Sequence, residues 1–121
     1  MSNEVFSSPV LSFRVFQNTT GAFQCEGHYQ GIQVLAAMPI NDNSKCVILL
    51  DPTANKEPRF ENLLCVARDG SVVWRAELPE SDGAVVSFKI TEAGLFANTW
   101  SGYYVQINGS NGKIIEREFV K

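Results

Sequence analysis

The residues best suited to chemistry are three cysteines and one histidine. A thiolate beside an imidazole base is a common enzymatic nucleophile, and this chain could build that pair only from Cys25, Cys46 or Cys65 with His28. Cys25 and His28 lie three residues apart in a strand-like segment, so their side chains should point to opposite faces. All three cysteines stand among apolar or strand-forming residues, where a thiol acts as a small hydrophobic group. We therefore expect no catalytic residue, and a cysteine-dependent enzyme using His28 with Cys46 or Cys65 is the least favoured alternative.

The same residues argue against a metal site and against a disulfide-held secreted domain. Three cysteines are an odd number, and their spacing lacks the close C-x-x-C pattern of zinc and dithiol motifs. One histidine cannot supply a three-histidine or His-Glu-x-x-His zinc site. Glu116 and Glu118 share a strand face, but we interpret them as solvated surface charge rather than a catalytic acid and base. We predict no metal and no cofactor.

Charge and hydropathy narrow the choice of partners. Ten lysines and arginines stand against thirteen aspartates and glutamates, giving a net charge of -3, so no basic excess is available for nucleic acid or anionic lipid. No apolar run approaches the roughly 18 residues of a spanning helix, and the start of the chain lacks the pattern of a signal peptide. We expect a soluble, cytoplasmic protein that binds neither nucleic acid nor membrane.

The elements that must position any site are short strands. Leu11, Phe13 and Val15 alternate with polar residues, as do two further sets, Val86, Phe88, Ile90 and Tyr103, Val105, Ile107. Turn residues recur every eight to twelve positions or so. Asp69-Gly70 predicts a type I′ hairpin, and turns are also expected at residues 101–102 and 108–112. The pattern indicates one all-β antiparallel domain over residues 1–121, with a flexible N-terminal segment at residues 1–8.

Three glycine-led hairpins give the sequence a period near forty residues. Segments that begin at Gly31, Gly70 and Gly112 align with one another, each preceded by another strand. In this alignment Cys25 and Cys65 occupy equivalent positions. The chain therefore has room for about three such repeats.

Residues 69–74, 94–108 and 111–115 resemble the blade repeat of quinoprotein-type (pyrroloquinoline-quinone-like) β-propellers. The matching motifs are Asp-Gly followed by two apolar residues and Trp74, and later a Gly-x-Tyr run that closes with Gly-Lys. The resemblance covers about residues 60–120 and implies four-stranded blades. Asn108 stands where the family often has aspartate, and the family's aspartate base, calcium ligands and adjacent cysteines have no counterpart here. It therefore implies no cofactor.

Three blades are fewer than the four or more that close a ring, so the resemblance implies an incomplete propeller or a small β-sandwich. An open sheet exposes unpaired backbone groups at its edges. We therefore expect self-association or binding to another protein.

The candidate contact residues are aromatic side chains and one long loop. Core burial is the favoured interpretation for Trp74 and Trp100, with surface contact as the alternative, and Tyr104 is expected to face outward. The loop at residues 52–59 carries two prolines and should be exposed. The predicted binding residues are Trp100, Tyr103, Tyr104, Asn55, Lys56 and Arg59.

These features favour a non-enzymatic protein-binding or accessory module, similar to small bacterial immunity-type proteins. The alternative is a carbohydrate-binding module in which Trp74, Trp100 and Tyr104 stack on sugar rings.

Overall fold

The computed structural model describes residues 3–55, 60–79 and 83–119, and their regular secondary structure consists of β-strands. In chain order the strands are β1 (Asn3–Phe6), β2 (Phe13–Gln17), β3 (Phe23–Tyr29), β4 (Ile32–Ile40), β5 (Lys45–Leu50), β6 (Leu63–Ala67), β7 (Val72–Arg75), β8 (Val85–Thr91), β9 (Gly94–Thr99), β10 (Tyr103–Ile107) and β11 (Ile114–Phe119). They form a seven-stranded sheet, β1 to β7, and a four-stranded sheet of order β11-β10-β9-β8. Every pairing is antiparallel. The predicted all-β antiparallel class is confirmed.

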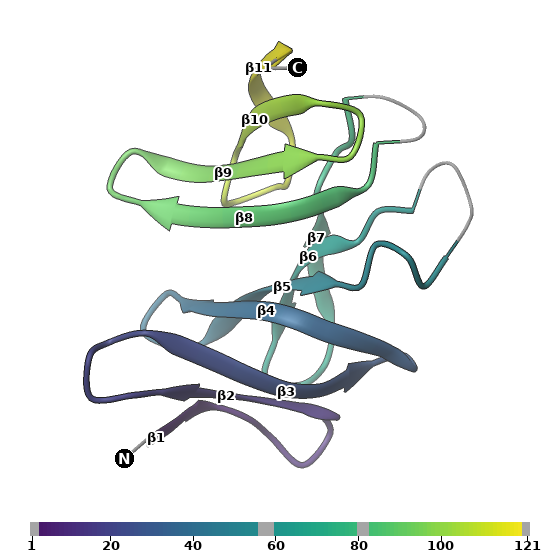
Figure 1. Cartoon of the computed structure of the whole chain (residues 1–121). Coiled ribbons are helices and arrows are strands. Elements are labelled where there is room, and N and C mark those ends of the chain that lie inside the picture. Colours follow the sequence, from purple (N-terminus) through teal and green to yellow (C-terminus); the bar gives the residue numbers. More distant parts are fainter. Residues whose placement is uncertain (1–2, 56–59, 80–82, 120–121) are drawn as a thin grey trace.

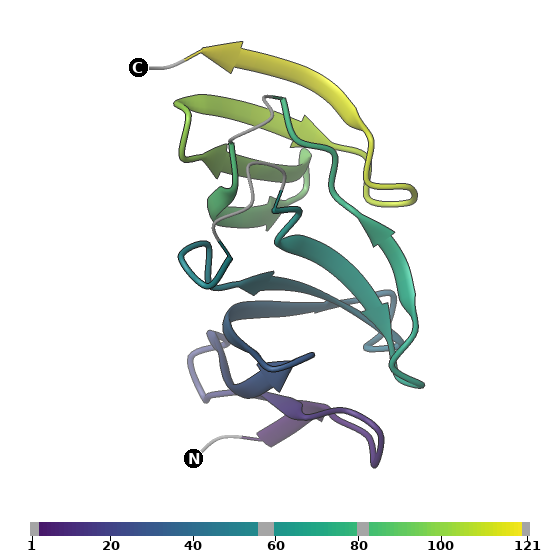
Figure 2. The same ribbon diagram turned by 90° about the vertical axis from the view of Figure 1, so that its right-hand side faces the viewer.

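The strands pack in three layers (Figures 1 and 2). β3 and β4 pair only at Tyr29 with Ile32 and His28 with Gln33, and the seven-stranded sheet turns there. Strands β1 to β3 then pack on one face of β4 to β7, and β8 to β11 pack on the other face. The two chain ends consequently lie at opposite ends of the stack (Figure 2).

Strands β5 and β6 form the middle of this stack because both of their faces are apolar. Along β5, Cys46, Ile48 and Leu50 enter the core shared with β1 to β3, whereas Val47 and Leu49 enter the core shared with β8 to β11. A strand buried on both faces needs a continuous apolar run rather than an alternating one, and the sequence from Cys46 to Leu50 is such a run.

The predicted alternation is confirmed in most strands, with one exception in β8. Phe13 and Val15 are buried and Arg14 is exposed, as expected. In β8, however, the pairing with β9 shifts between Val85 and Ser87. This bulge puts Val85 in the core and leaves Val86 exposed, because the extra residue reverses the direction of the side chains that precede it.

The hairpin predicted at Asp69-Gly70 joins β6 to β7, but its turn is not type I′. Gly70 has a φ of 88°, whereas Asp69 is not among the residues of positive φ. The Gly70 N–H donates to Ala67 O at 3.0 Å, and the Ala67 N–H donates to Ser71 O at 2.9 Å. These bonds define a three-residue loop, a type I turn with a left-handed glycine at its end.

The three aligned hairpins all exist, but they are not equivalent in the fold. The β6–β7 and β10–β11 hairpins each lie at an end of a sheet, whereas β3–β4 connects two packed layers. Correspondingly, Cys65 is fully buried and Cys25 is only half-buried. Gly31 follows the last strand of its layer, whereas Gly70 and Gly112 precede the last strand of theirs. The aligned turns therefore differ by one strand in their place within a layer.

The N-terminal segment differs from the flexible segment expected at residues 1–8, because its described part forms β1 and packs into the core. Phe6 has no exposed surface. Its ring lies under the guanidinium of Arg68, with the cation 4.9 Å from the ring centroid. Arg68 also donates to Ser7 O at 2.9 Å and Val5 O at 3.1 Å. A residue distant in sequence thus holds the start of the chain in place.

Candidate functional site

The candidate site is the outer face of the β8–β11 sheet, which points away from the stack. Because side chains alternate along a strand, the residues between those facing the core form a second, largely polar surface. Its members are Ser87, Lys89, Phe96, Asn98, Tyr104, Gln106, Glu116 and Glu118. Pairing aligns Tyr104 with Glu118, and Gln106 with both Phe96 and Glu116. We call this set the outer face.

An aromatic pair stands at the centre of the outer face. The rings of Phe96 and Tyr104 are stacked, with centroids 5.6 Å apart and planes 6° from parallel. The Lys89 ammonium lies 5.9 Å from the Tyr104 ring centroid. Beside the pair, Gln106 Nε2 donates to Ala93 O at 3.2 Å, which fixes the amide. Neighbouring strands therefore hold an aromatic wall in place through cross-strand contacts.

An open hollow of about 540 Å³ lies beside this wall. It is lined by Phe96, Tyr104, Gln106, Glu116, Arg117 and Glu118. Arg117 belongs to the alternate set of β11 side chains, and its Nη1 donates to Pro79 O at 3.1 Å. The hollow thus has an aromatic wall, an amide, a pair of carboxylates and one guanidinium, that of Arg117. These groups can bind a ligand by stacking, hydrogen bonding and charge.

The three predicted aromatic contacts occupy different places. Trp100 lies in the β9–β10 turn with 70% of its surface exposed, so the core interpretation was wrong for this residue. Tyr103 is half-buried and faces the core, with its ring edge-on to Phe119 at a centroid distance of 5.3 Å. Tyr104 faces outward, as predicted, and is the one of the three that belongs to the outer face.

The predicted loop contacts lie in another part of the chain, after β5. Asn55 is exposed. Lys56 and Arg59 lie outside the described residues. At the start of the loop, Asp51 accepts hydrogen bonds from the N–H and the hydroxyl of Thr53, and these bonds lower the pKa of its carboxyl.

Sequence reasoning overlooked Phe96 and treated Glu116 and Glu118 as ordinary solvated charge. The alternation of Phe96 with buried Leu95 and Ala97 was the available signal, since it puts a large aromatic ring on a polar face. The partnership of these residues with Tyr104 depends on strand register, which only the structure supplies.

Trp74 is a core residue, as the favoured interpretation held. It is 5% exposed, and its indole Nε1 donates to Gly109 O at 2.9 Å. It therefore cannot form a sugar-stacking platform with Trp100 and Tyr104.

The cysteines and His28 have the environments of structural residues. All three thiols are free, and burial raises the pKa of each of them. Cys25 and His28 point to opposite faces of β3, where Cys25 Sγ lies 3.6 Å from Val34 O and His28 is exposed. A raised pKa favours the thiol over the reactive thiolate.

Two further kinds of feature are absent from the described part of the chain. Within these residues no group of three or more histidine, cysteine, aspartate or glutamate side chains is placed to hold a metal ion. Over the same residues, no helix of the length and apolar character needed to cross a membrane is present.

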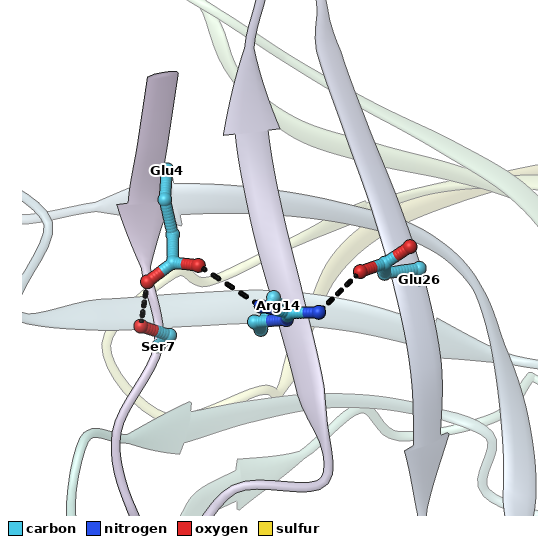
Figure 3. A network of polar contacts seen from close by, with 4 residues as sticks. All are labelled: Glu4, Ser7, Arg14 and Glu26. Atoms are coloured by element: carbon cyan, nitrogen blue, oxygen red, sulfur yellow. Dashed lines mark hydrogen bonds and ion pairs between the residues drawn. The ribbon is translucent and has the colours of Figure 1, made fainter. Parts of the chain in front are cut away.

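The opposite end of the stack carries a different surface, formed by β1 to β3 (Figure 3). Arg14 lies between two carboxylates there, 2.8 Å from Glu26 and 3.6 Å from Glu4. Ser7 donates a short hydrogen bond to the same Glu4 side chain. The charges of this surface are thus paired with one another, whereas Glu116 and Glu118 form no ion pair within the part of the chain that the structure describes.

Comparison with known proteins places the chain in a family. No curated protein matches it in sequence. A crystal structure of the computationally designed Ika8 protein is similar in fold, with a TM-score of 0.54 and 11% sequence identity. The similarity covers 98% of this chain but 37% of the designed one, and it concerns the fold alone. A family model described as "Domain of unknown function (DUF7957)" matches residues 33–119, which is more than half of the sequence, and the chain therefore belongs to that family.

Proposed function

We propose that this protein is a non-enzymatic, protein-binding accessory module that presents the outer face to its partner. The observation that carries the proposal is the stacked Phe96–Tyr104 pair, held on a sheet face that the described residues of the chain leave uncovered. Aromatic side chains combine apolar area with low conformational entropy, and Tyr adds a polar group, so they are enriched where proteins bind. The exposed Trp100 in the adjoining turn extends the same kind of surface.

Charge favours a different protein over a second copy as the partner. The outer face carries Glu116 and Glu118 against Lys89, and the other end of the stack carries Glu4 and Glu26 against Arg14. The outward-pointing side chains of each end therefore include two carboxylates and one cation, while Arg117 lines the hollow from the other set of β11 side chains and donates to Pro79 O. Stacking two copies end to end would bring surfaces of like net charge together, which is unfavourable.

We also interpret the packed layers as relatives of propeller blades. The four-stranded meander β8 to β11 packs face to face on β4 to β7. In a ring of blades the next blade would cover the outer face, so a partner protein would take that place here. The reduced state of all three buried or half-buried thiols is compatible with action in the cytoplasm.

The test is affinity purification from the native cell with three versions of the protein. A Tyr104→Ala variant removes the tyrosine ring from the aromatic wall. A Phe16→Ala variant is the control, because it removes an aromatic ring from β2, near Arg14 at the other end of the stack. We expect one protein to be retained by the wild type and by the control but lost with Tyr104→Ala. Equal retention by both variants would overturn the proposal.

Two further measurements separate the alternatives. Size-exclusion chromatography with light scattering should give a monomer at high concentration, and a stable dimer abolished by Tyr104→Ala would instead assign the surface to self-association. A glycan panel monitored by tryptophan fluorescence should give no response. A response that requires Tyr104 would replace protein binding with carbohydrate binding.

A further inference from the structure

We infer that the hollow on the outer face binds an arginine side chain of the partner, with the guanidinium against Tyr104 and paired with the carboxylates of Glu116 and Glu118. This inference rests on the proposed function and names the chemistry of its partner.

Two carboxylates of like charge line the hollow close to each other. Glu116 and Glu118 are two residues apart on β11 and project to the same face, so their side chains start about 7 Å apart and repel each other. Among residues the structure describes, the ion pairs are those of Arg14 with Glu4 and Glu26, and neither Glu116 nor Glu118 takes part in one. Arg117 also lines the hollow, but its guanidinium donates to Pro79 O and, among the described residues, forms an ion pair with neither glutamate. A further cation placed between the two carboxylates would relieve their repulsion.

Each of the two carboxylates has a neighbour on β10. Glu118 is the cross-strand partner of Tyr104, and Glu116 is the partner of Gln106. Each carboxylate is therefore next to an aromatic ring or a fixed amide in the lining of one hollow. The face already stabilises one cation on an aromatic ring, because the Lys89 ammonium lies 5.9 Å from the Tyr104 centroid.

Arginine fits this set of groups better than the other cations. Its planar guanidinium stacks on an aromatic ring while its donors form two parallel bonds to a carboxylate. A metal ion would gain little from the aromatic wall, since magnesium and calcium prefer a shell of oxygen ligands. The ligand class is therefore an arginine-bearing segment of a protein.

The experiment uses a capped hexapeptide with two central arginines flanked by glycines, added to the ¹⁵N-labelled full chain. We expect amide shifts centred on Tyr104, Gln106, Glu116 and Glu118, with affinity in the range of about 1 mM or tighter. The same peptide with citrulline, which is neutral and nearly the same shape, should bind at least about fivefold more weakly.

Variants test the roles assigned to the carboxylate of Glu118 and the ring of Tyr104. Glu118→Gln and Tyr104→Leu should each weaken binding about three- to fivefold. Glu92→Gln is the matched control, because it removes the same charge from the exposed β8–β9 turn and should leave binding unchanged. Each variant's amide spectrum reports whether it folds as the wild type does.

The outcomes distinguish this inference from the proposed function. Equal binding of the citrulline peptide, an equal loss with Glu92→Gln, or no amide shifts at 5 mM, about five times the expected Kd, would overturn arginine recognition. If the native partner is nevertheless lost with Tyr104→Ala, the proposed function stands without it. If the arginine peptide binds as expected but partner retention is the same in all variants, the hollow binds arginine and the proposed function is wrong.

Discussion

Asn62 joins the two sheets through its hydrogen bonds to Val85. The buried Asn62 Nδ2 donates to Val85 O at 2.7 Å, and Asn62 Oδ1 accepts from the Val85 N–H at 2.8 Å. The same Nδ2 donates to Leu50 O at 2.9 Å. One side chain thus pairs the start of β8 with the end of β5, at the boundary between the middle layer and the layer that carries the outer face.

Replacing Asn62 should therefore destabilise the whole fold. Asn62→Leu leaves the N–H and carbonyl of Val85 buried without these partners, and we expect the free energy of unfolding to fall by about 3 kcal/mol in urea titrations. Asn98→Ala is the control, because Asn98 is exposed and its side chain, within the described residues, donates only to the Ser87 hydroxyl. It should cost less than about 0.5 kcal/mol. Equal effects of the two changes would show that Asn62 does not join the sheets energetically.

Two arginines that contact the N-terminal segment, Arg68 and Arg14, should differ in their contribution to stability. Arg68 donates to three backbone carbonyls and covers the Phe6 ring, whereas Arg14 forms exposed ion pairs. We expect Arg68→Ala to lower the free energy of unfolding by about 1 to 2 kcal/mol and Arg14→Ala by less than about 0.5 kcal/mol.

Amide hydrogen exchange measures the effect of Arg68 on β1 directly. Arg68→Ala should speed amide exchange in β1 more than elsewhere, because its donors hold Val5 and Ser7. A β1 that exchanges as slowly in Arg68→Ala as in the wild type would contradict the role we assign to Arg68.

The two tryptophans should differ in how strongly a soluble quencher reduces their fluorescence. Trp100 is 70% exposed and Trp74 is 5% exposed, so iodide should quench one class of emission and leave the other. Trp100→Phe should remove the quenchable class, and Trp74→Phe should retain it. Quenching that survives Trp100→Phe in the folded protein would place the accessible indole at Trp74 and contradict the structure.

Stability should fall in alkaline solution because of the buried thiols. Burial raises the pKa of the Cys46 thiol above its ordinary value of 9.0. Above pH 9 the unfolded chain therefore loses this proton while the folded chain keeps it, and unfolding becomes easier as pH rises. The contribution is about 1.4 kcal/mol for each pH unit above 9 while the folded thiol stays protonated.

The Cys46→Ala variant isolates this contribution, since other groups also titrate in the same range. Its free energy of unfolding should decline less steeply than that of the wild type between about pH 8 and about pH 10.5, a range that includes the ordinary thiol pKa. Cys25→Ala, at a half-buried position, should change the slope less. Parallel slopes for wild type and Cys46→Ala would refute the assignment.

The outer face was only partly predictable, for reasons visible in its residues. Period-two alternation put Tyr104 and Gln106 on one side of a strand and Glu116 and Glu118 on one side of another. The alternation does not show that these two pairs lie on the same face of one sheet, because cross-strand neighbours depend on strand register. The bulge that exposes Val86 is a similar case, since an unpaired residue leaves no mark in the alternation itself.

The amino-acid pattern alone determined the all-β class, the antiparallel hairpins and the doubly apolar run that became the centre of the stack, because each depends on neighbours within a few residues. Tertiary structure decided the rest. The ordering of β1 by Arg68, the joining of the sheets by Asn62, the burial of Trp74 with exposure of Trp100, and the grouping of Phe96 and Tyr104 beside the β11 carboxylates all involve residues brought together by layer packing and strand register. Such contacts depend on where distant segments meet, which local periodicity does not specify.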